Sequence, residues 1–388
     1  MYYKKRCMLP HTWLRKRIKK PCRIAFNVVE YGHVMTLDEL RAEIDRIDAQ
    51  IVALIKQRMQ CVHGVGELKK EAKSHIFVPE RESKLIEKIL RHNDGVLPEK
   101  GLMSIYRQIV SMSLHLEGGV KAGYLGPPGT WSHQAAQSRF GDSVELVPYP
   151  SFQQIFRAVE VGEINYGIIP IENSTDGRIS QAVDLLGSTE LRICAQIHLN
   201  VRNCLMANIE RPQIRKIYSH SQVLGQCREW LRKNFPKAEL ISTASTTVAA
   251  KLAHDEAENG AAALGSPLAA EYNGLQVLET NIQDKAGNTT RFAIIGNQTT
   301  EPCGKDRTTI CFGVPHTAGS LVDVLSVFKE HGINIYCMDS RPTRDTAWEY
   351  IFYIDVEGHA NCEPLKSCVE ILRKRTPMFK VLGSYPEN

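Results

Sequence analysis

Long apolar runs are missing from this 388-residue sequence. No run approaches the roughly 18 residues that a membrane-spanning helix requires, and no segment has the pattern of a secretory signal peptide. The apolar content of 43% and the charged content of 23% are ordinary for a globular protein. We therefore expect a cytoplasmic protein of two or three domains with no membrane partner.

Paired cysteines are missing as well. The eleven cysteines are scattered, and they form neither a C-x-x-C pair nor a metal-ligand spacing. This pattern favours reduced thiols in a cytosol, and we expect no metal and no other cofactor.

The basic character of the chain is confined to its first 34 residues. Residues 1–34 carry nine Lys or Arg against one acid, Glu30, whereas the remaining chain has a net charge of −3. Such an arm could bind nucleic acid, serve as a targeting peptide, or be sequence translated upstream of a true start at Met35. We favour the last alternative, because residues 36–39 form a clear helix start.

A regular apolar pattern follows this arm. The residues that carry it are Leu40, Ile44, Ile47, Ile51 and Leu54. Their three- and four-residue steps predict one amphipathic helix from Leu37 to about Lys73. Roughly 35 residues is long for a globular helix, which indicates intertwined partners and therefore a homodimer or a higher homo-oligomer.

Two cations fall near this apolar stripe. At about 100° per residue, Arg58 and Lys69 lie within about 20° of each other, and Arg41 points about 100° away from Arg58. Buried cations are costly unless an anion meets them, although long side chains can also snorkel at the edge of a stripe. The pair favours a binding interior, and Arg41 would serve another surface.

Two shorter helices are predicted next, over residues 80–92 and after Pro98. Both place polar side chains toward the same interior. These side chains are Arg81, Glu82, Ser113 and Glu117. A cavity lined mainly by cations suits a small dicarboxylate.

On these residues, the segment 35–118 resembles the all-helical chorismate mutase domain of the bifunctional chorismate mutase–prephenate dehydratase family. The resemblance implies a three-helix domain in an intertwined dimer that rearranges chorismate to prephenate. The implied substrate contacts are Arg58 and Arg81 to carboxylates, Arg41 in the partner's site, Lys69 and Glu117 at the ether oxygen, and Glu82 and Ser113 at the hydroxyl-bearing side. Because Glu117 must be protonated to donate to the ether oxygen, mutase activity is expected to fall as the pH rises above neutral.

A second pattern, of alternating strands and helices, begins after Gly119. In four strand–turn–helix units, hydroxyl or amide side chains stand beside a helix N-terminus, where they either cap the helix or bind an anion. A fifth polar segment runs from Gly287 to Phe292, where Thr290 and Arg291 enter an apolar strand, although threonines there can simply favour a strand. Together the five segments predict a cleft between two α/β lobes that binds a small acid.

The motifs in these segments resemble those of the prephenate dehydratase domain over residues 120–297. They are Gly126-Pro127, Pro170-Ile171-Glu172-Asn173-Ser174, Tyr218-Ser219-His220, Gln226-Cys227 and Thr290-Arg291-Phe292. The resemblance implies two lobes like those of periplasmic binding proteins, and a reaction that removes CO₂ and water from prephenate to give phenylpyruvate. It makes Thr290 the proton donor or activator and Arg291 the carboxylate anchor. The other substrate-binding residues that it implies are Thr130, Ser132, Glu172, Asn173, Ser174, Ser219, Gln226 and Phe292.

The last pattern, over residues 306–386, predicts the βαββαβ order of a ferredoxin-like α+β unit. It contains no convergent acid–base set. Its motifs Ala318-Gly319-Ser320-Leu321-Val322 and Asp339-Ser340-Arg341-Pro342 resemble those of the ACT regulatory domain of the same family, which implies feedback inhibition by L-phenylalanine. The implied effector contacts are Ala318, Gly319, Ser320, Leu321, Val322, Asn334, Asp339, Ser340, Arg341 and Pro342.

Other functions fit parts of the sequence. Two lobes around a cleft also describe solute-binding proteins, and the last unit alone could be an amino-acid sensor. The basic arm lacks the aromatic interleaving and the recognition motif of a nucleic-acid binder, so no nucleic-acid partner is expected. The sequence as a whole favours a multidomain enzyme that acts on chorismate and prephenate.

Overall fold

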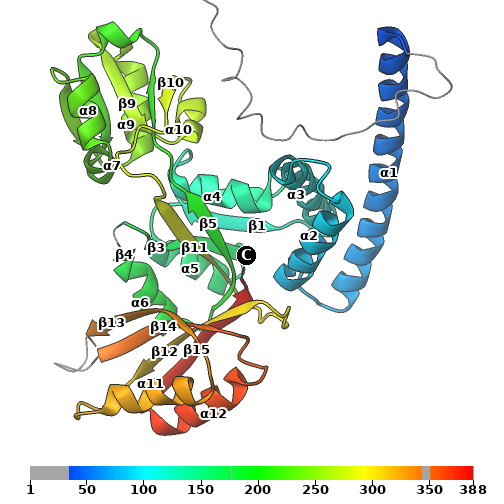
Figure 1. Cartoon of the computed structure of the whole chain (residues 1–388), viewed down its shortest axis with the longest axis vertical. Helices are drawn as coiled ribbons and strands as arrows, with labels where there is room; N and C mark the ends of the chain where they lie inside the picture. Colours follow the sequence, from blue (N-terminus) through cyan, green and yellow to red (C-terminus); the bar gives the residue numbers. More distant parts are fainter. Residues whose placement is uncertain (1–34, 176, 343–349, 388) are drawn as a thin grey trace, which may run out of the picture.

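The computed structural model describes residues 35–175, 177–342 and 350–387 (Figure 1). The basic extension 1–34 lies outside the described residues. The rest forms a helical segment, two α/β lobes and a C-terminal unit, in that order along the chain. None of the described helices is both long and apolar enough to cross a bilayer.

The helical segment consists of α1 (Leu37–Glu71), α2 (Pro79–Asn93) and α3 (Glu99–Leu116). Thr36 caps α1 by accepting a hydrogen bond from the backbone N–H of Glu39, and the Glu39 carboxylate accepts one from the N–H of Thr36. The three helices lie where the periodicity predicts them. In Figure 1, α1 stands apart from the two lobes, whereas α2 and α3 lie closer to them.

The apolar stripe of α1 is exposed in the single chain. The exposed fractions are 37% for Leu40, 55% for Ile44, 41% for Ile47, 47% for Ile51 and 63% for Leu54. Within α1, Val62 and Gly66 are the buried residues, at the end of the helix that packs on α3. The expectation that the stripe faces a core is therefore not met within one chain.

The loop between α1 and α2 is anchored in the first lobe through Phe77. Its ring is 1% exposed and lies 5.2 Å from the ring of Phe140 and 5.1 Å from that of Tyr166. The backbone carbonyl of Phe77 accepts a hydrogen bond of 3.1 Å from Gln298. The helical segment and the first lobe thus share one apolar core.

Two sheets form the two lobes. The first sheet has the order β2-β1-β3-β11-β5 with β4 paired to β3, and the second has the order β10-β6-β9-β7-β8. The first-sheet strands are β1 (Lys121–Leu125), β2 (Glu145–Tyr149), β3 (Tyr166–Asn173), β4 (Gly177–Arg178), β5 (Arg192–Asn200) and β11 (Thr289–Gly296). The second-sheet strands are β6 (Cys204–Ala207), β7 (Lys216–His220), β8 (Glu239–Thr243), β9 (Ala261–Gly265) and β10 (Gln276–Thr280). The chain therefore crosses between the lobes twice, after β5 and before β11.

Helices cover both sheets, as the alternating pattern predicts. Those of the first lobe are α4 (Trp131–Phe140), α5 (Phe152–Glu160) and α6 (Ser180–Ser188). Those of the second lobe are α7 (Ser221–Gln226), α8 (Arg228–Asn234), α9 (Thr246–Asp255) and α10 (Pro267–Tyr272).

The C-terminal unit has the predicted βαββαβ order. It comprises β12 (Asp306–Gly313), α11 (Ser320–Glu330), β13 (Ile335–Pro342), β14 (Tyr350–Glu357), α12 (Leu365–Arg375) and β15 (Met378–Pro386). The four strands pair antiparallel in the order β13-β14-β12-β15, and both helices lie on one side of this sheet in Figure 1.

Strand β15 packs closely on β5 of the first lobe. A Cβ atom on Gly383 would lie 2.1 Å from the carbonyl oxygen of Ile193, so glycine is required there. Arg192 adds a hydrogen bond of 2.6 Å to the carbonyl of Val381. The C-terminal unit is thus joined directly to the sheet that carries Thr290.

Candidate active sites

Four of the predicted residues form two pairs where α1 packs on α3. Arg58 donates a hydrogen bond of 2.6 Å to the Ser113 hydroxyl, which in turn donates to the carbonyl of Ile109. Lys69 Nζ lies 2.5 Å from Glu117 Oε2, with both side chains largely buried. Two cations, a hydroxyl and a carboxylate on adjoining helices form a polar group able to hold an anionic ligand.

The two remaining arginines of the predicted helical site are both exposed in the single chain. Arg41 is near the start of α1, exposed, with its guanidinium 3.6 Å from the carboxylate of Asp38. Arg81 is also exposed, in the first turn of α2. Arg41, near the other end of α1, does not reach the Lys69–Glu117 pair of the same chain.

Glu82 is turned away from this group, contrary to expectation. Its carboxylate accepts a hydrogen bond of 2.8 Å from Arg139 on α4, and both side chains are nearly buried. Arg139 also stacks over the ring of Phe77 at 5.3 Å. The sequence pattern missed this pairing because it joins residues 57 positions apart in two different segments.

The predicted interlobe cleft is present. A hollow of about 1020 Å³ is lined by residues 174–175, by parts of α7 and α8, and by the segment 283–288 that leads into β11. Ser174 and Gln226 are the predicted site residues that line it. The Gln226 side chain also accepts a hydrogen bond of 3.3 Å from Asn203.

Thr290 and Asn173 form a buried pair beside this cleft. They are register partners on β11 and β3, and the Asn173 amide donates a 2.8 Å hydrogen bond to the Thr290 hydroxyl oxygen. The Asn173 carbonyl oxygen accepts from the backbone N–H of Thr175, which fixes the amide orientation. The Thr290 oxygen accepts this hydrogen bond through a lone pair, so the bond does not use the proton of the hydroxyl.

Several predicted dehydratase contacts serve the fold instead. Thr130 accepts from the N–H of His133 and donates to the carbonyl of Leu125, so it caps α4. Ser132 is buried within α4, and the fully buried Ser219 donates to the carbonyl of Leu264.

Phe292 is a core residue, 1% exposed. The register of β11 against β3 shifts between Arg291 and Phe292, and such a shift interrupts the alternation of faces along a strand. The expectation that Phe292 contacts substrate is therefore not met.

Arg291 does not line the cleft, and the prediction that it anchors a carboxylate there is wrong. Its guanidinium is buried against the C-terminal unit, with Nη2 2.8 Å from Glu172 and 2.5 Å from Asp355 of β14. Burial alone would lower the pKa of Arg291, but the attraction of Asp355 and other groups around it outweighs burial and raises that pKa. The charge of Arg291 is thus fixed within the protein.

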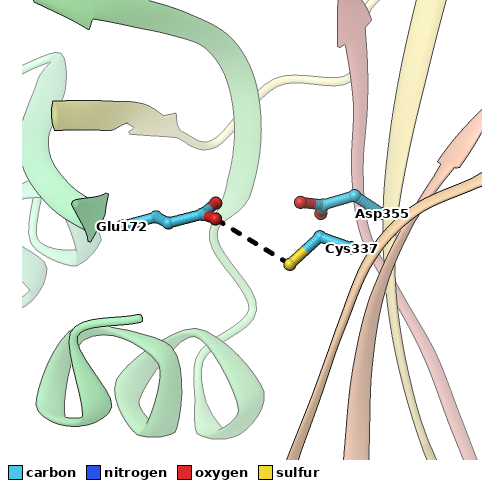
Figure 2. A group of neighbouring side chains, drawn as sticks. All are labelled: Glu172, Cys337 and Asp355. Atoms are coloured by element: carbon cyan, nitrogen blue, oxygen red, sulfur yellow. Dashed lines mark hydrogen bonds between the residues drawn. The ribbon is translucent and has the colours of Figure 1, made fainter. Parts of the chain in front are cut away.

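Glu172, Cys337 and Asp355 bring their ligand atoms together in a manner that could suit a metal ion (Figure 2). However, both carboxylates already contact the guanidinium of Arg291. Arg291 supplies the positive charge that a metal ion would bring to these carboxylates. The cluster is therefore an ion-pair network.

The comparisons with known proteins agree with this arrangement. Sequence models match the chorismate mutase type II family over residues 40–118 and the prephenate dehydratase family over residues 122–300. The bifunctional chorismate mutase/prephenate dehydratase of Aquifex aeolicus is 40% identical over 356 residues, which are 90% of this chain and 98% of that protein. The chain belongs to this bifunctional family.

Two solved structures are similar as well. Prephenate dehydratase from Arthrobacter aurescens, in complex with L-Phe, is 29% identical with a TM-score of 0.64, over 69% of this chain and 90% of that one. A structure described as GqqA, a quorum-quenching acylase, is 27% identical with the same TM-score, over 69% of this chain and 98% of that one.

The bifunctional enzyme thus carries both activities in one chain. It rearranges chorismate to prephenate and converts prephenate to phenylpyruvate in phenylalanine biosynthesis. The mutase match covers the helical segment, and the dehydratase match covers the two lobes. The C-terminal unit lies beyond both matched ranges.

In this enzyme, the two predicted effector motifs lie on different parts of the C-terminal unit. The first, Ala318, Gly319, Ser320, Leu321 and Val322, lines a hollow of about 360 Å³ at the start of α11. Asp339 and Arg341 of the second motif pair with each other on β13 at 2.9 Å, and Arg341 also contacts the Ser180 hydroxyl. Ser340, Pro342 and Asn334 are exposed on or beside this strand.

Two cleft residues escaped sequence reasoning. Asn288 is 8% exposed, and neither atom of its side-chain amide has a hydrogen-bond partner among the described residues. Lys285 is the one cation among the described residues that line the cleft. Both residues lie in or beside the polar segment that precedes Thr290. That segment was the sequence signal that could have identified them.

Proposed function

We propose that the Lys69–Glu117 group performs the mutase reaction and that the Thr290–Asn173 pair performs the dehydratase reaction. The observation that carries the proposal is the presence of two separate buried polar groups, one in each matched segment. A binding-only role would leave the cation-lined helical group unexplained.

The mutase reaction requires a compressed substrate and positive charge where the C–O bond breaks. Lys69 would donate to the ether oxygen, and Glu117 would donate from the other side once it carries a proton. Arg58 and Ser113 would hold a carboxylate and a hydroxyl of the substrate, with Arg81 and the partner's Arg41 completing the charge.

The dehydratase reaction expels hydroxide as water while the C–CO₂ bond electrons flow into the ring. Thr290 would donate its proton to the leaving hydroxyl, and the Asn173 amide would stabilise the oxygen that remains until solvent water returns the proton to it. With Arg291 unavailable, Lys285 and Asn288 would bind the substrate carboxylates, together with Ser174 and Gln226. The lobes would close on substrate about the two crossing segments, as in periplasmic binding proteins.

The C-terminal unit would act as an ACT domain that binds L-phenylalanine at the hollow formed by residues 318–322. The L-Phe complex of the Arthrobacter aurescens enzyme supports this assignment. The effector would reduce dehydratase turnover.

A coupled assay tests the proposed function. Chorismate absorbance should disappear and alkaline phenylpyruvate absorbance should appear with no cofactor added, and millimolar L-phenylalanine should slow the second change more than the first. Chorismate loss without phenylpyruvate would contradict the dehydratase assignment. Identical rates with and without phenylalanine would contradict the regulatory one.

The apolar stripe of α1 predicts a dimer. Covering five side chains that are each 37% to 63% exposed would stabilise an assembly by about 1 kcal/mol or more per residue. Ile47→Asp should therefore shift sedimentation toward monomer and reduce mutase activity while dehydratase activity persists. Glu67→Asp, on an exposed position of the same helix, is the control. A wild-type chain that sediments as monomer at micromolar concentration would refute the dimer.

A further inference from the structure

A hollow of about 310 Å³ lies where α2 and α3 meet α4 and β5 of the first lobe (Figure 1). Its volume is at the lower end of the range of small-molecule pockets, which is roughly 300 to 1,000 Å³. The hollow is separate from both proposed reaction sites, because none of Lys69, Glu117 and Thr290 lines it. It therefore has room for one small molecule at the junction of the helical segment and the first lobe.

Gln196 is a buried glutamine of β5 that lines this hollow. It is 2% exposed, and neither Nε2 nor Oε1 of its amide has a hydrogen-bond partner among the described residues. Across the sheet its register partner is Ala293, whose side chain offers no hydrogen bond. A buried amide without a partner costs free energy that an apolar side chain of similar size would not cost. The fold alone therefore gives no reason for a polar side chain at this position.

Arg139 of α4 adds a second unpaired polar group to the lining of the hollow. Its Nη1 donates to Glu82, and its guanidinium stacks over the ring of Phe77. Its Nε and Nη2 have no partner among the described residues, although the side chain is only 10% exposed. Nε and Nη2 form the planar fork that binds a carboxylate through two parallel hydrogen bonds. Glu82 and Phe77 thus hold the guanidinium in place and leave this fork for a ligand.

The remaining lining indicates the size and the charge of that ligand. The apolar residues that α2 and α3 contribute are Leu85, Ile86, Ile89, Met103 and Val110. Among the charged lining residues, Arg107 and Arg139 stand against Glu82, which leaves one positive charge in excess. An apolar wall with one excess positive charge suits a monoanion that has an apolar body.

We propose that this hollow binds a small monocarboxylate whose apolar body carries a hydroxyl or keto oxygen next to the carboxylate. The carboxylate takes the Nε–Nη2 fork of Arg139, the neighbouring oxygen takes the Gln196 amide, and the apolar body packs on α2 and α3. Both side chains have rotatable bonds that turn their buried polar ends toward such a ligand. The inference does not depend on the roles proposed for Lys69 and Thr290.

Calorimetric titration of the full-length chain with 3-phenyllactate tests the proposal, because this probe carries a carboxylate, an adjacent hydroxyl and an apolar ring. We expect a dissociation constant below about 1 mM, and a rise in melting temperature with probe concentration. The neutral 3-phenyllactamide lacks the charge that the Arg139 fork requires, so it should bind at least about tenfold more weakly. Absence of binding by 3-phenyllactate at about 10 mM would overturn the proposal.

Gln196→Leu tests the assignment of the site. Leucine is of similar size and lacks the amide, so 3-phenyllactate should bind at least about tenfold more weakly. The melting temperature of the ligand-free variant should be no lower than that of the wild type, because an unpaired buried amide has been removed. Gln153→Leu, at an exposed position of α5 in the same lobe, is the matched control and should bind like the wild type. Wild-type affinity in Gln196→Leu, or a ligand-free variant that melts several degrees lower, would overturn the inference.

Arg139→Lys and Lys285→Met separate this hollow from the interlobe cleft. Arg139→Lys keeps a charge beside Glu82 but loses the planar fork, so binding should again weaken at least about tenfold. Lys285 lines the cleft, and Lys285→Met should leave binding unchanged. Binding that is lost in Lys285→Met and kept in Arg139→Lys would belong to the cleft and would overturn the proposal.

The two enzymatic rates provide the last discriminator. In the absence of 3-phenyllactate, Gln196→Leu should rearrange chorismate and form phenylpyruvate at the wild-type rates, because the hollow is separate from both reaction sites. A loss of about tenfold or more in either rate, with the melting temperature retained, would make the hollow part of an active site. That result would overturn its assignment as a separate binding site.

Discussion

Replacement of Thr290 by alanine is expected to reduce dehydratase turnover about a thousandfold, while chorismate rearrangement continues at the wild-type rate. The hydroxyl is buried beside the cleft and its oxygen accepts a hydrogen bond from Asn173. Without it, the leaving hydroxyl has no donor from β11 and the Asn173 amide loses its partner. The measurement is phenylpyruvate formation from prephenate, with chorismate consumption followed on the same sample.

Thr289→Ala is the matched control for this variant. Thr289 is the adjacent residue of the same strand, but its hydroxyl donates to the Asn200 side chain at the edge of the sheet. It should retain dehydratase turnover within a few fold. Equal loss in both variants would mean that the strand end, and not the Thr290 hydroxyl, is what the reaction requires.

Replacement of Lys69 by methionine should have the reciprocal effect. Mutase activity should fall about 100- to 1000-fold, because the breaking C–O bond loses its buried positive charge, and dehydratase activity on added prephenate should remain. Lys69 also donates to the carbonyl of Ile76, so the variant removes a contact to the α1–α2 loop. Chorismate disappearance is the measurement, and loss of both activities would point to misfolding.

Two variants accompany Lys69→Met. Lys70→Met changes the neighbouring, exposed lysine and should leave the mutase unchanged. Glu117→Gln keeps a hydrogen-bond donor at this position and removes the ion pair with Lys69, so mutase activity should persist in this variant. A loss of mutase activity as large as that of Lys69→Met would contradict donation from position 117.

Local periodicity predicted most of the architecture. The helix from Leu37, the alternating lobes and the βαββαβ order of the C-terminal unit all follow from patterns that one segment contains by itself. Thr290 was singled out because a hydroxyl at the start of a strand is a local signal of a site, and Asn173 was added from the family resemblance; the catalytic roles of both stay predictions.

The errors have a common physical cause, which is contact between distant segments. Arg291 was placed in the cleft because the sequence does not indicate that its guanidinium pairs with Asp355 of β14. Glu82 was assigned to the helical site because its partner, Arg139, lies in a later segment of the chain. The local pattern around Glu82 does not indicate that partner. Asp355 was missed because a single acidic residue in an apolar strand indicates a buried ion pair only when its cationic partners are known.

The buried ring of Phe77 has a consequence for any attempt to separate the helical segment from the first lobe. A protein chemist who cuts the gene after Gly119 to obtain a stand-alone mutase would remove the first lobe from that ring, including the Arg139 side chain that stacks over it. The excised helices would expose the apolar ring of Phe77. This ring lies next to Ile76, whose carbonyl accepts a hydrogen bond from Lys69. Excision would therefore need a polar replacement at position 77.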